Sequence, residues 1–187
     1  MGEGALLLAF VTGERAIELV WAHRNTGRLL AHGGTEFGRG HYPVMVALHA
    51  AWLACLWILG RDRAVELPLL AVFAVLQIAR LWVLASLGAR WTTRVVVVPG
   101  ETLVAAGPYR LIRHPNYLIV LAEIVVVPLA LGLVLDAALF GALNAALLAY
   151  RIRVEEAALT WARGQGAQQG PRQATRAGAA GDLAKPG

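Results

Sequence analysis

Long apolar stretches separated by short polar segments dominate the first 160 or so residues of the chain. The two clearest stretches cover 43–59 and 65–87, and the polar turn Gly60-Arg61-Asp62-Arg63 separates them. Each approaches the roughly 20 residues that an α-helix needs to cross the hydrocarbon layer of a membrane. We therefore predict two adjacent membrane-spanning helices here.

A third apolar stretch, over 117–150, is too long for one crossing and is interrupted around 132–136. This pattern predicts a helical hairpin with Asp136 near the far surface of the membrane. Its arms would have about 17 and 14 residues, which is short for the second arm. We therefore expect the second arm to continue as helix beyond the membrane, through 151–159.

The segment over 5–21 is the weakest candidate for a span, because Glu14, Arg15 and Glu18 interrupt its apolar face. Either the start of the chain cuts this helix short, or these charges face protein or a wet cavity. Counting it gives five spans. The predicted fold class is all-α, an integral membrane bundle of about five transmembrane helices.

The chain changes character after Arg163. The remaining sequence, GQGAQQGPRQATRAGAAGDLAKPG, has one leucine and no aromatic residue, so it cannot bury a core. We predict a membrane domain over 1–163 and a disordered tail over 164–187.

Composition supports a membrane protein. Of the 187 residues, 58% are hydrophobic and 16% are charged, whereas soluble domains are about a quarter charged. The net charge is +5, and all the basic residues except Lys185 are arginines. On so apolar a chain, this charge favours arginines at the rims of a membrane protein over a nucleic-acid binder.

The basic residues are distributed unevenly between the loops. Only Arg61 and Arg63 fall on one predicted side of the membrane. The other side holds Arg24, Arg28, Arg39, Arg90, Arg94, Arg110, Arg113, Arg151, Arg153, Arg163, Arg172, Arg176 and Lys185. Because positive loops stay in the cytosol, we predict an outside N-terminus and a cytosolic C-terminus.

The segment GPYRLIRHPNY, over 107–117, carries the clearest candidate chemistry and follows a short extended segment predicted at 95–98. Its two prolines bias the residues before them away from helix, so it forms a constrained turn at the start of the fourth span. Free N–H groups there add positive potential, which suits a carboxylate or phosphate. Alternatively, Arg110, Arg113 and His114 anchor the helix end to lipid headgroups. The residues alone leave both possibilities open.

Three further charged positions allow two interpretations each. Glu155 and Glu156 form either a functional pair or a solvated helix face with partners such as Arg151, four residues before Glu155. Arg80, inside a predicted span, either orients a substrate or pairs with Glu123 or Glu18. The histidines form no HxxxH or HxxHH cluster, so we predict no metal site.

Together, GPYRLIRHPNY, an apolar hairpin and RIRVEEAAL resemble the isoprenylcysteine carboxyl methyltransferase family, specifically its small bacterial branch. The resemblance covers about 14–159. It implies an S-adenosylmethionine site at the cytosolic face of the bundle. The cofactor-binding residues that it implies are Tyr109, Arg110, His114, Tyr117, Glu155 and Glu156.

The resemblance further implies methylation of a carboxyl or hydroxyl oxygen on a lipophilic small-molecule acceptor, either isoprenylcysteine-like or an alkylpyrone-type polyketide lipid. Arg113 and Arg80 are the candidates to orient the acceptor oxygen. The expected location is the bacterial inner membrane, with the bilayer as partner and no nucleic acid. The alternatives are a phospholipid N-methyltransferase, which shares both motifs, and a non-catalytic membrane scaffold or transporter-like protein.

Overall fold

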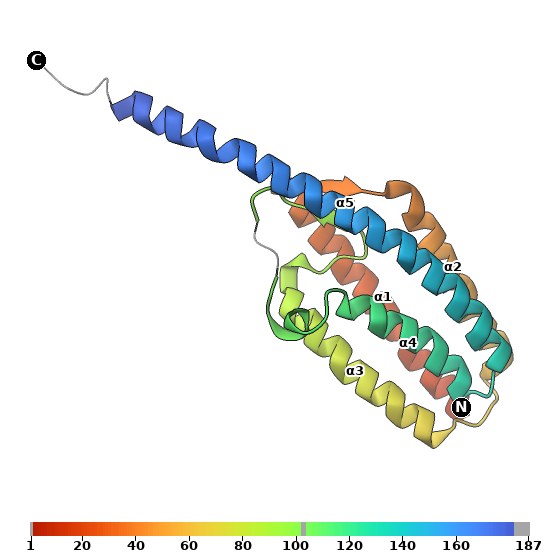
Figure 1. Cartoon of the computed structure of the whole chain (residues 1–187). Helices are drawn as coiled ribbons and strands as arrows, with labels where there is room; N and C mark the ends of the chain where they lie inside the picture. Colours follow the sequence, from red (N-terminus) through yellow and green to blue (C-terminus); the bar gives the residue numbers. More distant parts are fainter. Residues whose placement is uncertain (1, 102–103, 182–187) are drawn as a thin grey trace, which may run out of the picture.

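The computed structural model describes residues 2–101 and 104–181, with side chains described as far as Gly164. Five α-helices run alongside one another, with α4 in the middle of the bundle between α3 and α5 (Figure 1). The helices are α1 (Glu3–Ala31), α2 (Tyr42–Gly60), α3 (Leu67–Leu87), α4 (Pro115–Ala130) and α5 (Val134–Gly181). Short 3-10 turns, η1 (Arg39–His41), η2 (Gly88–Arg90) and η3 (Gly107–Arg110), lie in the connections. This architecture confirms the all-α membrane bundle.

The predicted hairpin is formed by α4 and α5. Its tight turn at 131–133 is closed by a 2.8 Å hydrogen bond from the Leu133 N–H to the Pro128 carbonyl. Gly132 has a φ of +69°, a left-handed conformation that glycine adopts without steric cost. As expected, α5 passes through 151–159 without a break.

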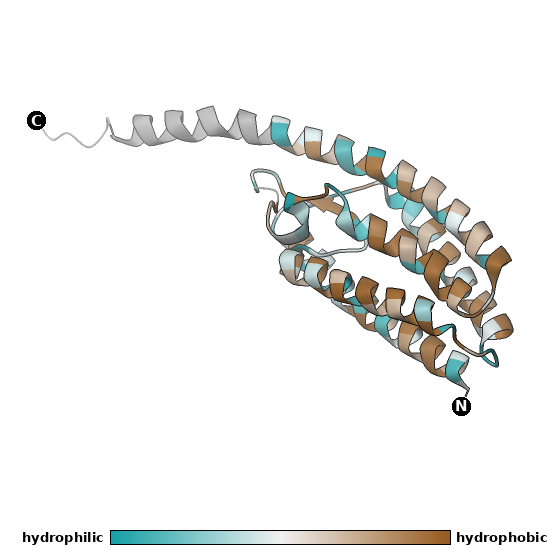
Figure 2. Ribbon diagram, turned by 60° about the horizontal axis from the view of Figure 1, so that its bottom comes forward, coloured by the Kyte–Doolittle hydropathy of each residue, from teal (hydrophilic) through white to brown (hydrophobic). Residues whose placement is uncertain are grey.

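Three helical segments in the described part are long and apolar enough to cross a membrane: Arg39–Gly60, Leu67–Arg90 and Val134–Gly164. The apolar residues are concentrated along the helices of the bundle (Figure 2). Helix α4 is apolar but has only 16 residues, and α1 carries charges in its middle. A crossing of the membrane by α1 and α4 therefore stays a prediction.

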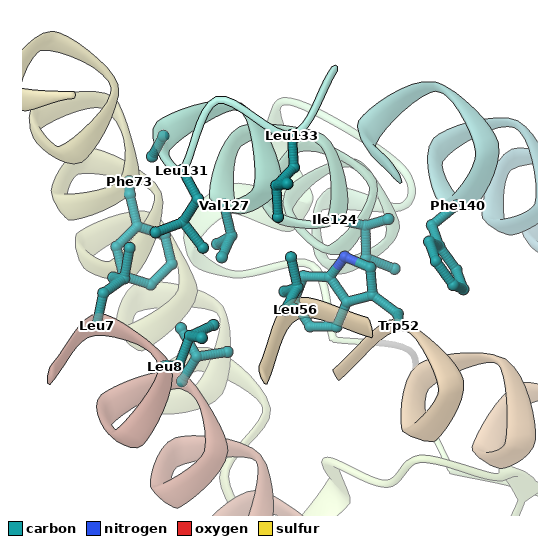
Figure 3. Packing of buried hydrophobic residues seen from close by; sticks show 12 residues of the cluster. Leu7, Leu8, Trp52, Leu56, Phe73, Ile124, Val127, Leu131, Leu133 and Phe140 are labelled. Carbon is teal, nitrogen blue, oxygen red and sulfur yellow. The ribbon is translucent and has the colours of Figure 1, made fainter. Parts of the chain in front are cut away.

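The main core lies toward the end of the bundle that holds the hairpin turn. Leu8, Trp52, Leu56 and Val127 are almost fully buried there, and Phe73 joins them from α3 (Figure 3). Gly60 permits a close approach, since a Cβ at this position would lie 2.8 Å from Cδ1 of Leu131. In a bilayer such contacts stabilise the bundle through van der Waals packing, because the lipid tails are as apolar as the core.

A two-stranded antiparallel sheet caps the opposite end. Strand β1 (Thr35–Phe37) pairs with β2 (Val95–Val97), with Glu36 opposite Val96, which confirms the extended segment predicted at 95–98. The side-chain amide of Asn25 ties α1 to this end by donating to the Trp91 carbonyl at 2.9 Å. We call it the sheet end; it holds the loops with most of the arginines, whereas Arg61 and Arg63 lie at the opposite end. The orientation of the two ends across the membrane stays a prediction.

The backbone of α5 continues to Gly181, whereas the sequence led us to expect no fixed structure after Arg163. The expectation rested on the low hydrophobicity of this stretch. Hydrophobicity indicates whether a segment can pack into a core, but it does not indicate whether the segment forms a helix by itself. Side chains beyond Gly164 and residues 182–187 lie outside the described part. The domain boundary at 163 therefore stays a prediction.

Candidate functional site

A cleft of about 770 Å³ opens at the sheet end between β2, the turn before α4 and the middle of α5. Because α4 and α5 are antiparallel, the start of α4 lies beside the part of α5 that follows its apolar segment. The hairpin thus brings together two motifs that are about 40 residues apart in the chain. Predicted site residues that line the cleft are Tyr109, Arg113, His114, Tyr117, Glu155 and Glu156.

Tyr117 connects the two motifs directly. Its hydroxyl donates a hydrogen bond to Oε2 of Glu155 and accepts one from Nε of Arg151 at 2.9 Å. The Arg151 guanidinium also lies over the Tyr117 ring, 5.4 Å from its centroid. This chain of contacts fixes α5 against the first turn of α4 and holds the Glu155 carboxylate at the cleft wall.

His114 stands at the N-terminal end of α4 and stacks on Tyr117, with ring centroids 5.4 Å apart and planes 11° apart. Its Nδ1 is 3.8 Å from Oε1 of Glu155. An imidazole and a carboxylate therefore share one wall, and a zwitterionic ligand could meet both a donor and an acceptor there.

Tyr109 lies in η3, just before the RHPNY turn. Burial raises the pKa of its phenol, and the Glu155 carboxylate raises it further, so the hydroxyl stays protonated and able to donate. Gly107 begins this 3-10 turn with a φ of +57°. A Cβ there would clash with Oγ of Ser86, so a larger residue would displace the turn from α3.

Two predicted site residues, Arg110 and Arg80, are not among the described residues that line the cleft. Arg110 is exposed and is not among the described side chains that line the cleft, because η3 directs Tyr109 inward and its neighbour outward. Arg113 is exposed at the cleft rim. Arg80 is buried inside the bundle and does not line the described cleft.

Arg80 belongs to a buried ion cluster that joins α1, α3 and α4. It donates to Glu18 at 2.5 Å and to Glu123 at 2.7 Å, and lies 3.1 Å from Glu14. Arg15 adds a 2.5 Å contact with Glu123. Of the two roles that the sequence left open for Arg80, the structure shows ion pairing with both Glu18 and Glu123. We call Glu14, Arg15, Glu18, Arg80 and Glu123 the ion cluster.

Three cleft residues were missed by the sequence analysis as parts of a site. Arg151 was considered only as a helix-face partner of Glu155. Asn116 and Trp91 each contribute a buried polar atom, Oδ1 and Nε1 respectively, without a hydrogen-bond partner among the described residues. The position of Asn116 inside RHPNY was the available signal. No group of three His, Cys, Asp or Glu side chains suited to a metal ion occurs in 2–101 or 104–164.

Comparisons with known proteins show which family the chain belongs to. The model of the isoprenylcysteine carboxyl methyltransferase (ICMT) family matches residues 69–161, a range that includes both cleft motifs. The Bacillus subtilis (strain 168) protein YpbQ is 38% identical over 159 residues, which cover 82% of this chain and 95% of that protein. This chain belongs to the ICMT family.

Membership in the ICMT family confirms the resemblance seen in the sequence and makes the chain a member of a membrane methyltransferase family. No solved structure matches significantly.

Proposed function

We propose that this ICMT-family protein transfers a methyl group from S-adenosylmethionine to an ionised carboxyl or hydroxyl oxygen of a lipophilic acceptor. The observation that carries the proposal is the cleft itself. It joins the RHPNY turn to the Glu155-Glu156 segment at one end of a membrane bundle.

The chemistry of the cleft residues fits this cofactor. Glu155 and Glu156 supply carboxylates that can accept from an ammonium group or ribose hydroxyls, while His114 and Arg113 can bind a carboxylate. The unpartnered Oδ1 of Asn116 can accept from an adenine amino group, and Nε1 of Trp91 can donate. These buried atoms would gain partners when a polar ligand fills the cleft, which offsets the cost of leaving them unsatisfied.

When bound, S-adenosylmethionine supplies a methyl group on a positively charged sulfur that is already a good leaving group. An ionised oxygen needs no base, so the chain has to align the acceptor, exclude water and keep the oxygen charged. With the predicted orientation, the cleft opens to the cytosol.

Binding of labelled S-adenosylmethionine to the detergent-purified protein tests the proposal. We expect binding by the intact chain and at least about tenfold weaker binding after His114→Ala or Glu156→Ala, because each loses a charge-assisted contact. Glu66→Ala is the matched control, since Glu66 is exposed at the opposite end of the bundle. Failure of the intact protein to bind would refute the proposal.

The product identifies the acceptor atom. Incubation with a lipid extract and methyl-labelled cofactor should give a labelled lipid. Mild alkali releases labelled methanol from a carboxyl methyl ester, whereas methyl ethers and methylamines keep the label. Label in an amine headgroup would favour phospholipid N-methylation and contradict the proposed oxygen acceptor.

A further inference from the structure

Arg151 is a buried cation in the wall of the cleft. Its exposed fraction is 4%, and it is the first charged residue of α5 after the uncharged segment over 137–150. It therefore lies where the apolar part of the helix ends and the cleft begins. Burying a guanidinium in such a place is costly unless it is paired or serves a ligand.

The contacts of Arg151 leave much of its hydrogen-bonding capacity unused. Nε donates to the Tyr117 hydroxyl, and Nη1 lies 3.2 Å from Sδ of Met45, a weak thioether acceptor. Within the described ranges, Nη2 has no hydrogen-bond partner and no carboxylate forms an ion pair with the guanidinium. The Glu155 carboxylate is bound instead by the Tyr117 hydroxyl.

The ion cluster gives an internal comparison. Arg80 is equally buried, and three carboxylates surround its guanidinium. The bundle thus neutralises one buried arginine completely while leaving the other with a phenol and a thioether. An arginine that serves only to hold helices together would be expected to be paired with carboxylates, as Arg80 is.

Arg151 differs from the cationic groups of the RHPNY turn in the elements that surround it. Met45 comes from α2, inside the candidate membrane span Arg39–Gly60. Arg113 and His114 come from the loop before α4. Arg151 thus lies at the wall of the cleft next to the apolar segments of α2 and α5. A lipid-soluble acceptor whose tail stays in the apolar layer would bring its polar head to this wall.

We propose that Arg151, positioned by Tyr117, forms the oxyanion subsite of the methyl acceptor, which would be a lipid carboxylate or an acidic enolate. The proposal rests on the proposed function and names the group that binds its substrate. A guanidinium presents parallel N–H donors that match two oxygens of such an acceptor, and its charge keeps the acceptor ionised. Arg151 takes the place that the sequence analysis gave to Arg113 or Arg80.

Charge balance agrees with this assignment. A lone pair of the acceptor oxygen forms the new carbon–oxygen bond, while the electron pair of the broken carbon–sulfur bond stays on sulfur. The negative oxygen and the positive sulfur both become neutral, so no proton has to be removed. An ether or ester product has lost the charge that held it at Arg151, which favours its release.

Binding of a matched acid and amide tests the subsite without the cofactor. The probes are N-acetyl-S-farnesyl-L-cysteine and its carboxamide, which differ in charge but hardly in shape. Wild-type protein should prefer the acid by at least about tenfold, and Arg151→Gln should abolish that preference. Arg151→Lys should keep part of it. Arg153→Gln is the matched control, because Arg153 is exposed two residues further along α5, and it should behave as wild type.

A second measurement uses the wild-type chain and does not depend on a variant folding. Phenylglyoxal modifies guanidinium groups that it can reach, including those at the wall of an open cleft such as Arg151, and mass spectrometry locates them. Bound acid should protect Arg151 while the carboxamide does not, and Arg153 should react in both cases. Equal modification of Arg151 with either probe, or no preference of the wild type for the acid, would overturn the proposal.

The cofactor's own carboxylate is the other possible anion. We expect Arg151→Gln to leave the affinity for S-adenosylmethionine within about threefold of wild type. If the affinity falls tenfold while the acid is still preferred, Arg151 serves the cofactor and the acceptor subsite is wrong. Failure of wild type to bind the cofactor would refute the proposed function, whereas the acid–amide comparison is scored independently.

Discussion

Replacing Arg80 by methionine is the most informative perturbation of the bundle, because it removes a cation from the ion cluster and roughly preserves side-chain volume. The cluster holds three carboxylates against two guanidinium groups. Without Arg80, only Arg15 remains to neutralise Glu14, Glu18 and Glu123. Glu123 is completely buried, so water cannot replace the lost partner.

Breaking a buried ion pair by removing one partner costs about 3–5 kcal/mol. For a chain of this size, each kcal/mol changes the melting temperature by about 2–4 °C, so we expect a decrease of roughly 6–20 °C. Glu123→Gln should be milder, about 1–3 kcal/mol, because it leaves two carboxylates facing two guanidinium groups. The double variant should lose less stability than the sum of the two single losses, by about 0.5–3 kcal/mol.

Thermal unfolding of the detergent-purified protein, followed by tryptophan fluorescence, measures these differences. Arg61→Met is the matched control, since the Arg61–Asp62 ion pair is exposed and such pairs contribute about 0–1 kcal/mol. A melting temperature for Arg80→Met that equals that of Arg61→Met would refute the reasoning. So would a double variant whose loss equals or exceeds the sum of the single losses.

Three further predictions concern the cleft and the tail. Gly107→Ala should lower cofactor affinity and thermal stability, because the new Cβ meets Ser86 in a left-handed turn; binding and melting assays measure both. Tyr117→Phe should weaken labelled-cofactor binding about 5–30-fold, since it removes the hydroxyl that holds Glu155, and unchanged binding would contradict this. Ending the chain after Arg163 should leave cofactor affinity and melting temperature unchanged; a loss of either would show that the functional domain extends further.

Much of the fold can be predicted from the sequence because apolar length and polar interruption are local properties. The spans around α2 and α3 and the hairpin of α4 and α5 follow from them. The charges of α1 illustrate the limit. Glu18 pairs with Arg80, 62 residues away, and Arg15 with Glu123, 108 residues away. Such long-range pairing makes an interrupted apolar face compatible with burial, and no local pattern reveals it.

The site shows the same division. The sequence identifies the two motifs, and the antiparallel hairpin explains why they meet. The sequence does not determine which side chains of the turn line the cleft. Within η3, Tyr109 lines the cleft and the next residue, Arg110, does not. Nor does the sequence distinguish Arg151 from an ordinary helix-face partner of Glu155. The distinction depends on the hydrogen bond that the Tyr117 hydroxyl donates to the Glu155 carboxylate.

Because α5 is uninterrupted, the residues that it contributes to the cleft lie far along a single helix that begins at the hairpin turn. From Val134 to Glu155 the helix rises about 32 Å, so a tilt of about 5° at the hairpin turn displaces its Glu155 end by about 3 Å. That displacement is comparable to the length of a hydrogen bond. Helices tilt to match the thickness of the bilayer around them. We therefore expect the thickness of the host membrane to influence the geometry of the cleft.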